Sequence, residues 1–194
     1  MKKMCVLAIC LLFASAGAFA MDKAAGGGIL YNNSTTLGEV EGYDWEMNRN
    51  GFGAFGFFGM SQFLEFNFGF LYKDPSSIKL DGETYSVAFD PAAALQLGIY
   101  GKYPIPLSDT LVFFPTGGID LELSLSDEDY SGWKWWHDLW LRAGVGLDVF
   151  FSEKLFLRSH LIYGAAIPVG GEEEMGLKFG HGFLFKVGLG WMLQ

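Results

Sequence analysis

The chain has 194 residues, of which 17% are aromatic and 18% are charged, and its formal net charge is −9. An acidic protein lacks the basic surface that nucleic acids need, so the composition argues against a nucleic-acid partner. The length fits one domain, and no stretch reaches the roughly 18 consecutive apolar residues of a membrane-spanning helix.

The first 20 residues have the layout of a secretory signal peptide. Lys2 and Lys3 make a basic start, residues 4–13 form an apolar run, and a cleavage motif of the small-x-small type ends at Ala20. We therefore expect cleavage after Ala20 and export through the general secretory route, which leaves one domain over residues 21–194.

Both cysteines of the chain, Cys5 and Cys10, lie in this leader. The exported domain is therefore expected to contain neither thiols nor disulfides. Lipoprotein processing at Cys10 is an alternative. It fits poorly, because the residue before a lipidated cysteine is normally small and here it is Ile9.

Six segments alternate large apolar residues with small or polar ones, which is typical of strands that have two different faces. In the first, LEFNFGFLYK, Phe66 and Phe68 share one face, and Glu65 and Asn67 share the other. The six segments cover residues 64–73, 95–103, 111–125, 139–151, 155–167 and 183–193. Two Gly-rich strands are expected at residues 25–33 and 50–60, and the pattern leaves their facing open.

The connections between these eight expected strands alternate between long and short. The long ones cover residues 34–49, 74–91, 126–136 and 168–178 and hold most of the acids; the short ones lie at 61–62, 104–109 and 152–154. The pattern predicts an all-β fold, an eight-stranded antiparallel transmembrane β-barrel with short periplasmic turns and four long extracellular loops. An even strand number places both termini of the chain in the periplasm.

The two faces of the strands differ in charge. The apolar faces of the six clearer strands carry no formal charge, whereas the opposite faces mix glycines with single charges. A Lys or Arg facing lipid costs about 2–4 kcal/mol near the midplane, so we expect the apolar faces to point to lipid. The polar faces then line a lumen that side chains can just fill, and buried charges there must be paired.

The expected polar network of the lumen consists of Glu65, Lys102, Asp120, Glu122, Arg142, Asp148, Arg158, His160 and Lys186. Packing is its expected role, and for Arg142 the sequence leaves two acidic partners open, Asp120 and Glu122. Nearer the outer mouth, four apolar lumen residues form a candidate pocket for small hydrophobic molecules: Leu71, Trp140, Ile162 and Leu184. Simple filling of the lumen beneath the loops is the alternative for these four.

No catalytic, metal or cofactor site is expected. Ser159 and His160 are neighbours on one strand and therefore point to opposite faces, while a serine nucleophile needs its base within about 3 Å. His137 and His181 near the outer rim lack the spacing of metal ligands.

The C-terminal sequence VGLGWMLQ resembles the signal by which bacterial outer-membrane barrels are recognised for assembly. Gly188, Trp191 and Leu193 match its glycine, aromatic and hydrophobic positions, although the chain ends in Gln194 rather than in Phe. With the strand pattern, the domain resembles the small eight-stranded outer-membrane proteins of the OmpX, OmpA-barrel and OmpW type. The resemblance implies a bacterial outer-membrane location, with outer-membrane lipid and the barrel assembly machinery as partners.

This fold hosts several functions, so the resemblance does not settle the role. The expected function is non-enzymatic: a filled polar lumen, and a structural or surface-interaction role, like that of an adhesin, in which acidic outer loops contact a host or other extracellular ligand. The alternative is a narrow channel or pocket for small hydrophobic molecules, as the resemblance to OmpW-type barrels implies.

Overall fold

The computed structural model describes residues 23–40, 42–80, 83–85, 92–125, 137–168 and 177–193, and every regular element in these ranges is a strand. The ten strands are β1 (Lys23–Val40), β2 (Tyr43–Gly59), β3 (Leu64–Leu80), β4 (Glu83–Tyr85), β5 (Ala92–Lys102), β6 (Ile105–Ser108), β7 (Leu111–Leu125), β8 (His137–Phe150), β9 (Leu155–Pro168) and β10 (Leu177–Leu193). The expected signal peptide lies outside the described residues. In the ranges above, no helix is long and apolar enough to cross a membrane.

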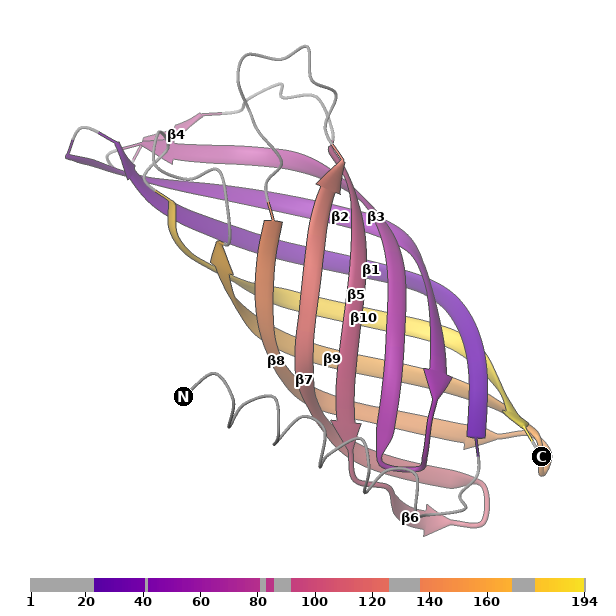
Figure 1. Ribbon diagram of the computed structural model, residues 1–194. Coiled ribbons are helices and arrows are strands. Elements are labelled where there is room, and N and C mark those ends of the chain that lie inside the picture. The colour runs from indigo at the N-terminus through magenta and orange to yellow at the C-terminus, as the bar shows by residue number, and fades with distance from the viewer. Residues whose placement is uncertain are drawn as a thin grey trace, which may run out of the picture.

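Eight of the strands close into a ring. Each pairs antiparallel with its neighbours in the order β2-β1-β10-β9-β8-β7-β5-β3, and the pairing of β2 with β3 closes the circle. The remaining two, β4 and β6, are short and pair only with β3 and β7. Figure 1 shows the resulting barrel, whose strands run obliquely around it. The sequence-based prediction of an all-β, eight-stranded antiparallel barrel is confirmed.

The two ends of the barrel differ. At one end, here called the hairpin end, β1 and β2 meet in a tight turn at Gly42, whose φ of 87° suits glycine. At the opposite end, called the turn end, connections 60–63 and 151–154 join β2 to β3 and β8 to β9. Lys23 pairs with Leu193 there, so the two described termini lie together at the turn end (Figure 1).

The prediction of a long loop at residues 34–49 is wrong, because β1 and β2 continue through these residues as one long hairpin. Thr35 pairs with Asn48, and the Thr35 hydroxyl donates a hydrogen bond to Asn48 Oδ1 at 2.7 Å. Both faces of this stretch are largely polar, so the alternation that marks a strand is absent from the sequence although the threonines suit one. Glu39 and Glu46 therefore lie on strands rather than in a loop.

Two further connections contain strands that the sequence pattern did not indicate. β3 continues to Leu80 and pairs there with β4, inside the expected loop at 74–91. The expected short turn at 104–109 contains β6, which pairs with the start of β7. The turns at 60–63 and 151–154 are tight as expected, and Ser61 Oγ accepts hydrogen bonds from the backbone N–H groups of Phe63 and Leu64, both at 3.1 Å.

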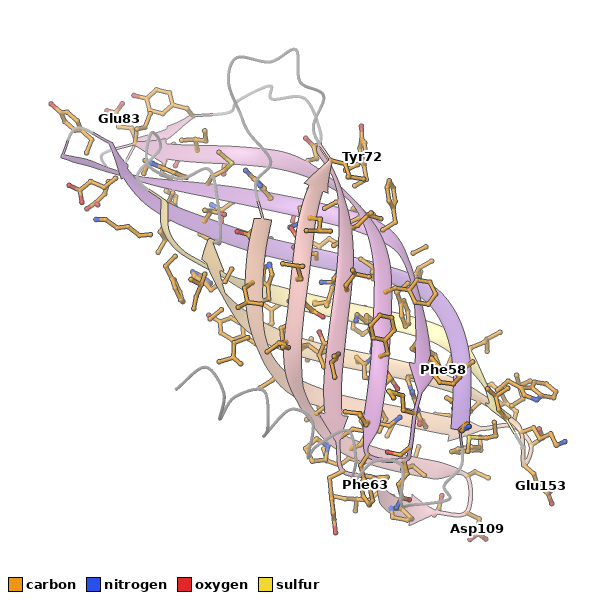
Figure 2. The ribbon with its side chains drawn as sticks, viewed as in Figure 1. Phe58, Phe63, Tyr72, Glu83, Asp109 and Glu153 are labelled. Carbon is orange, nitrogen blue, oxygen red and sulfur yellow. The ribbon has the colours of Figure 1, made fainter. Side chains whose placement is uncertain are left out.

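The two faces of the ring strands are opposite in character. Outward side chains are large, apolar and exposed, as on β3, where Phe66, Phe68 and Phe70 alternate with the buried Glu65 and Asn67. Figure 2 shows Phe58 and Tyr72 pointing away from the barrel wall. The facing that the sequence left open is also decided: β1 and β2 turn Leu30, Asn32, Phe55 and Phe57 inward.

Close backbone approach explains one pair of glycines at the seam between β1 and β10. Gly28 pairs with Gly188, and a Cβ built on Gly28 would overlap both Val187 O and Gly188 Cα. A Cβ on Gly59, by contrast, would lie 3.5 Å from Ala24 N, which is an ordinary contact.

We therefore expect Gly28→Val to lower the free energy of unfolding of the barrel by about 1–3 kcal/mol, because the strands must separate to admit the side chain. Gly59→Ala is the matched control and is expected to change stability little. Urea-induced unfolding of both variants in the same lipid checks this. Equal stability of both variants would show that the seam is looser than the structure has it.

Candidate functional site

The lumen is the part of the molecule where charged groups converge. Lys102 is nearly buried in it. Eight further charged side chains of the described residues are almost wholly buried there: Glu65, Lys73, Asp120, Glu122, Arg142, Asp148, Arg158 and Lys186. They are contributed by β3, β7, β8, β9 and β10, with Lys102 from β5. Strand pleating places them there, since each stands at an inward position of its strand.

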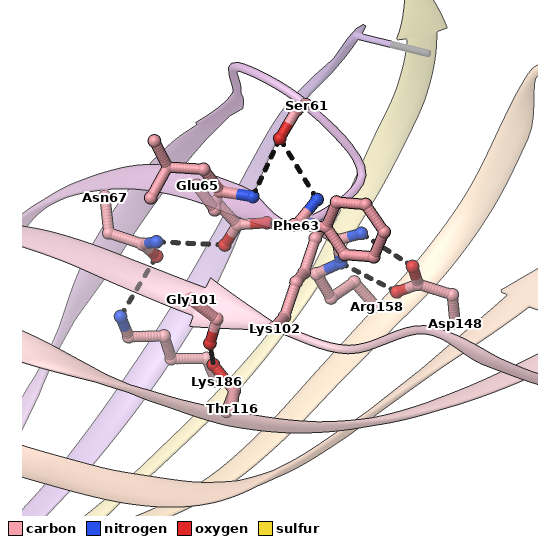
Figure 3. Close-up of polar contacts among 11 residues, drawn as sticks. Ser61, Phe63, Glu65, Asn67, Gly101, Lys102, Thr116, Asp148, Arg158 and Lys186 are labelled. Carbon is pink, nitrogen blue, oxygen red and sulfur yellow. Dashed lines mark hydrogen bonds and ion pairs between the residues drawn. The ribbon is translucent and has the colours of Figure 1, made fainter. Parts of the chain in front are cut away.

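A first cluster lies toward the turn end and is centred on Arg158. The guanidinium donates to Asp148 through Nε (2.7 Å to Oδ1) and Nη2 (2.6 Å to Oδ2), and Nη1 donates to Glu65. Lys102 Nζ also binds Glu65 Oε2, at 3.0 Å. Figure 3 shows Asp148 and Lys102 on either side of Arg158. Two pairs of neighbouring strands, β8 with β9 and β3 with β5, are thereby tied together across the lumen.

The Arg158 guanidinium is also enclosed by three aromatic rings. Its Cζ lies 4.5 Å from the ring centroid of Phe57, 4.9 Å from that of Phe156 and 5.3 Å from that of Phe114. Aromatic faces attract cations, and the attraction grows when water is excluded. Together with Glu65, Asp148 and Lys102, these groups form what we call the seal.

The side-chain amide of Asn67 also belongs to the seal and links Glu65 to Lys186. Asn67 Nδ2 donates to Glu65 Oε1 at 2.9 Å, and Lys186 Nζ donates to Asn67 Oδ1 at 3.1 Å (Figure 3). The Lys186 ammonium also lies 5.1 Å from the ring of Tyr100 and 5.5 Å from that of Phe55. Within the described part of the chain, no carboxylate pairs with Lys186, whose ammonium instead contacts an amide and two rings.

A second cluster lies nearer the hairpin end and is centred on Asp120. Its Oδ2 accepts from Tyr100 and from Gln96 Nε2 (3.2 Å), and Arg142 Nε stands 2.5 Å from the same oxygen as an ion pair. Beyond it, Lys73 forms an ion pair with Glu122. Of the two partners that the sequence left open for Arg142, the structure brings it to Asp120.

All nine residues of the expected lumen network face the interior, but they do not form one cluster. His160 makes none of these ion pairs: it is buried, and its ring meets the Phe114 ring edge-on at 5.2 Å. Asn67 lies on the inward face that the sequence pattern indicated, whereas the seal residues Phe57, Phe114 and Phe156 were missed by the sequence reasoning. Strand parity could have found the last two, because each stands two residues from a charged or polar lumen position.

The four residues of the candidate apolar pocket are all buried. Leu71, Ile162 and Leu184 belong to one packed hydrophobic cluster with Leu30 and Ala94. Trp140 instead stacks on the guanidinium of Arg142, with Cζ 4.2 Å from the ring centroid. These contacts describe how the four side chains pack, and the candidate pocket stays a prediction.

The rim at the hairpin end carries exposed charges. Lys178 at the start of β10 binds Glu39 on β1, with Asp44 on β2 3.6 Å away, and the hydrogen bond to Glu39 raises the pKa of Lys178. Lys79 on β3 reaches Glu46 at 3.5 Å. These pairs tie the extended β1–β2 hairpin to the adjoining strands β10 and β3, and because they are exposed each contributes little stability.

The residues of the expected assembly signal lie on β10 at the turn end. Gly188 is buried against Gly27 and Gly28, whereas Trp191 and Leu193 point outward and are exposed. As for a metal site, no three His, Cys, Asp or Glu side chains cluster for one within the described ranges.

No protein-family model and no curated protein sequence match this chain. Solved structures do match. The outer membrane protein OprG from Pseudomonas aeruginosa aligns with a TM-score of 0.53 and 12% identity, over 90% of this chain and 97% of that one. The outer membrane protein AlkL, solved in DMPC lipid bilayers, aligns with a TM-score of 0.49 and 15% identity, over 90% of each chain.

At such identities the likeness to OprG establishes the fold. The chain has the fold of a small bacterial outer-membrane β-barrel.

Proposed function

We propose that this protein is an integral β-barrel of a bacterial outer membrane, with a sealed lumen and a non-enzymatic role at the cell surface. The observation that carries the proposal is the inverted distribution of polarity. The outward faces of the ring are apolar and aromatic, while charged residues are buried inside. A barrel in water hides its apolar side chains, whereas a barrel in lipid exposes them.

The dimensions of the ring support this location. Its shortest strand, β5, has 11 residues, and the others have 14 to 18, while about 9–11 residues suffice for a tilted strand to cross the hydrocarbon. Exposed charges lie at the two ends. Figure 2 places Glu83 at one end and Asp109 and Glu153 at the other. The apolar belt lies between them.

The surface role is assigned to the hairpin end. There β1 and β2 pair over 17 positions from Ala24–Gly59 to Val40–Tyr43, well beyond the last pair of β5 with β3. This extension presents Glu39, Asp44 and Glu46 to solvent or to the rim. A rigid acidic hairpin suits contact with an extracellular ligand better than a solvated loop does, because less conformational entropy is lost on binding.

Thiol labelling on intact cells tests which end of the barrel faces the cell exterior. The only cysteines of the chain are Cys5 and Cys10, so the unaltered protein provides the background. Tyr43→Cys at the hairpin end should react with a membrane-impermeant thiol reagent. Glu153→Cys at the turn end should react only after the outer membrane is permeabilised. Labelling of both positions, or only of Glu153→Cys, in intact cells would reject the proposed orientation.

In planar bilayers the purified protein is expected to show no large, steady, porin-like openings. Water-filled lumens belong to barrels of about twice this strand number, and here the seal occupies the lumen. A stable conductance of porin size would contradict the sealed lumen. Small openings that change with Trp140→Ala and with a hydrophobic solute would instead favour a narrow conduit.

A further inference from the structure

Buried polar atoms in the lumen are satisfied very unevenly. In the seal, every side-chain nitrogen and oxygen of Glu65, Asn67, Asp148 and Arg158 is either paired or not fully buried. Nearer the hairpin end, seven buried atoms of described residues lack a hydrogen-bonding partner: Asn32 Nδ2 and Oδ1, Asp120 Oδ1, Glu122 Oε2, Trp140 Nε1, and Arg142 Nη1 and Nη2. Arg142 Nε also meets Asp120 at ion-pair distance without hydrogen-bonding geometry.

This set needs both donors and acceptors. The indole of Trp140 and the guanidinium of Arg142 offer N–H groups, while Asp120 and Glu122 offer carboxylate oxygens, and Asn32 offers both. A polar group left unpaired in a protein interior is destabilising, and native proteins leave few such groups. Seven such atoms in one half of the lumen point to an occupant.

Charge identifies the class of occupant. An anion at Arg142 would meet Asp120 and Glu122, and a cation at those carboxylates would meet Arg142 and Lys73. A neutral molecule that both donates and accepts suits all of these groups. Water does so and typically makes about three hydrogen bonds when buried.

We propose that the hairpin-end half of the lumen is a hydrated chamber, in which ordered water binds Asn32, Asp120, Glu122, Trp140 and Arg142. The seal beneath it is made by protein groups alone and is the barrier to permeation. This inference goes beyond the proposed function, since it needs the barrel but no surface partner. One buried atom on the seal side, His160 Nδ1, also lacks a partner; a lone ring nitrogen next to Phe114 is an isolated case rather than a cluster.

The chain offers a matched pair for the test, because Arg49, Arg142 and Arg158 are its only arginines. The ¹⁵N-labelled protein in lipid nanodiscs gives guanidinium signals, which Arg142→Lys and Arg158→Lys assign. Arg142 Nη protons should exchange with water at least about tenfold faster than those of Arg158, since exchange requires contact with water. The Trp140 indole proton should show direct magnetisation transfer from water.

Two results would overturn the proposal. Equally slow exchange at Arg142 and Arg158, with no transfer from water to Trp140, would show that the chamber is dry. Equally fast exchange at both would show that water passes the seal. Because the barrel must fold for either signal pattern to appear, these outcomes are separate from a failure of the surface role.

Discussion

Replacing Arg158 with methionine is expected to destabilise the barrel by about 3–5 kcal/mol, the usual consequence of breaking a buried ion pair by removing one partner. The substitution leaves Asp148 without its two hydrogen bonds and Glu65 with Lys102 and Asn67 only. It also removes the cation from between the rings of Phe57 and Phe156. The free energy of unfolding in urea, measured in bilayers of fixed composition, gives the value.

The control removes the acid that Arg158→Met would leave alone. In the double variant Asp148→Asn and Arg158→Met, no carboxylate at position 148 is left uncompensated and Glu65 keeps Lys102, so the double variant should be more stable than the single one. If the costs of the two substitutions simply add, Arg158 and Asp148 do not interact as the structure has them, and the seal is not an ion-pair network.

Phe68→Arg is the second substitution with a large expected effect. Phe68 is 53% exposed, uncharged neighbours surround it on β2 and β5, and it lies near the middle of the part of β3 that pairs with β5. An arginine at the midplane of a bilayer costs about 2–4 kcal/mol, so the variant should lose that much stability and assemble poorly. The amount of folded protein in the outer-membrane fraction and its unfolding free energy both report the loss.

Tyr43→Arg is the matched control, because Tyr43 is 60% exposed but lies at the tip of the β1–β2 hairpin. In lipid, only Phe68→Arg should be harmful. In a water-soluble barrel both positions would face solvent and both substitutions would be tolerated, so equal tolerance would contradict the membrane location.

The strands of the barrel could be predicted where one face is apolar and the other is not. On β3, alternation identified both the strand and the inward side of Glu65 and Asn67. It failed where both faces are polar, as at Thr35 and Asn48, because the period of two then leaves no trace in hydrophobicity. This stretch forms a hairpin because the antiparallel pairing of β1 with β2 continues into it from the barrel wall without a break.

The site was predictable by residue but not by partner. Strand parity placed Glu65 and Arg158 inside, yet their bond joins residues 93 positions apart in the chain. Which groups meet depends on strand tilt and stagger around the ring, and these are properties of the closed barrel rather than of any segment. Strand tilt and stagger also explain why Lys73 forms its ion pair with Glu122 while Arg142 pairs with Asp120.

The central claim is that the apolar outer face contacts lipid, and spin labelling measures this directly. Nitroxides attached at Phe68→Cys and at Tyr43→Cys, in a background with Cys5 and Cys10 replaced by serine, are compared by their collisions with oxygen and with a water-soluble nickel chelate. Oxygen concentrates in hydrocarbon, and the chelate stays in water. Oxygen should dominate at position 68 and the chelate at position 43. Dominance of the chelate at both positions would contradict a barrel that spans the membrane.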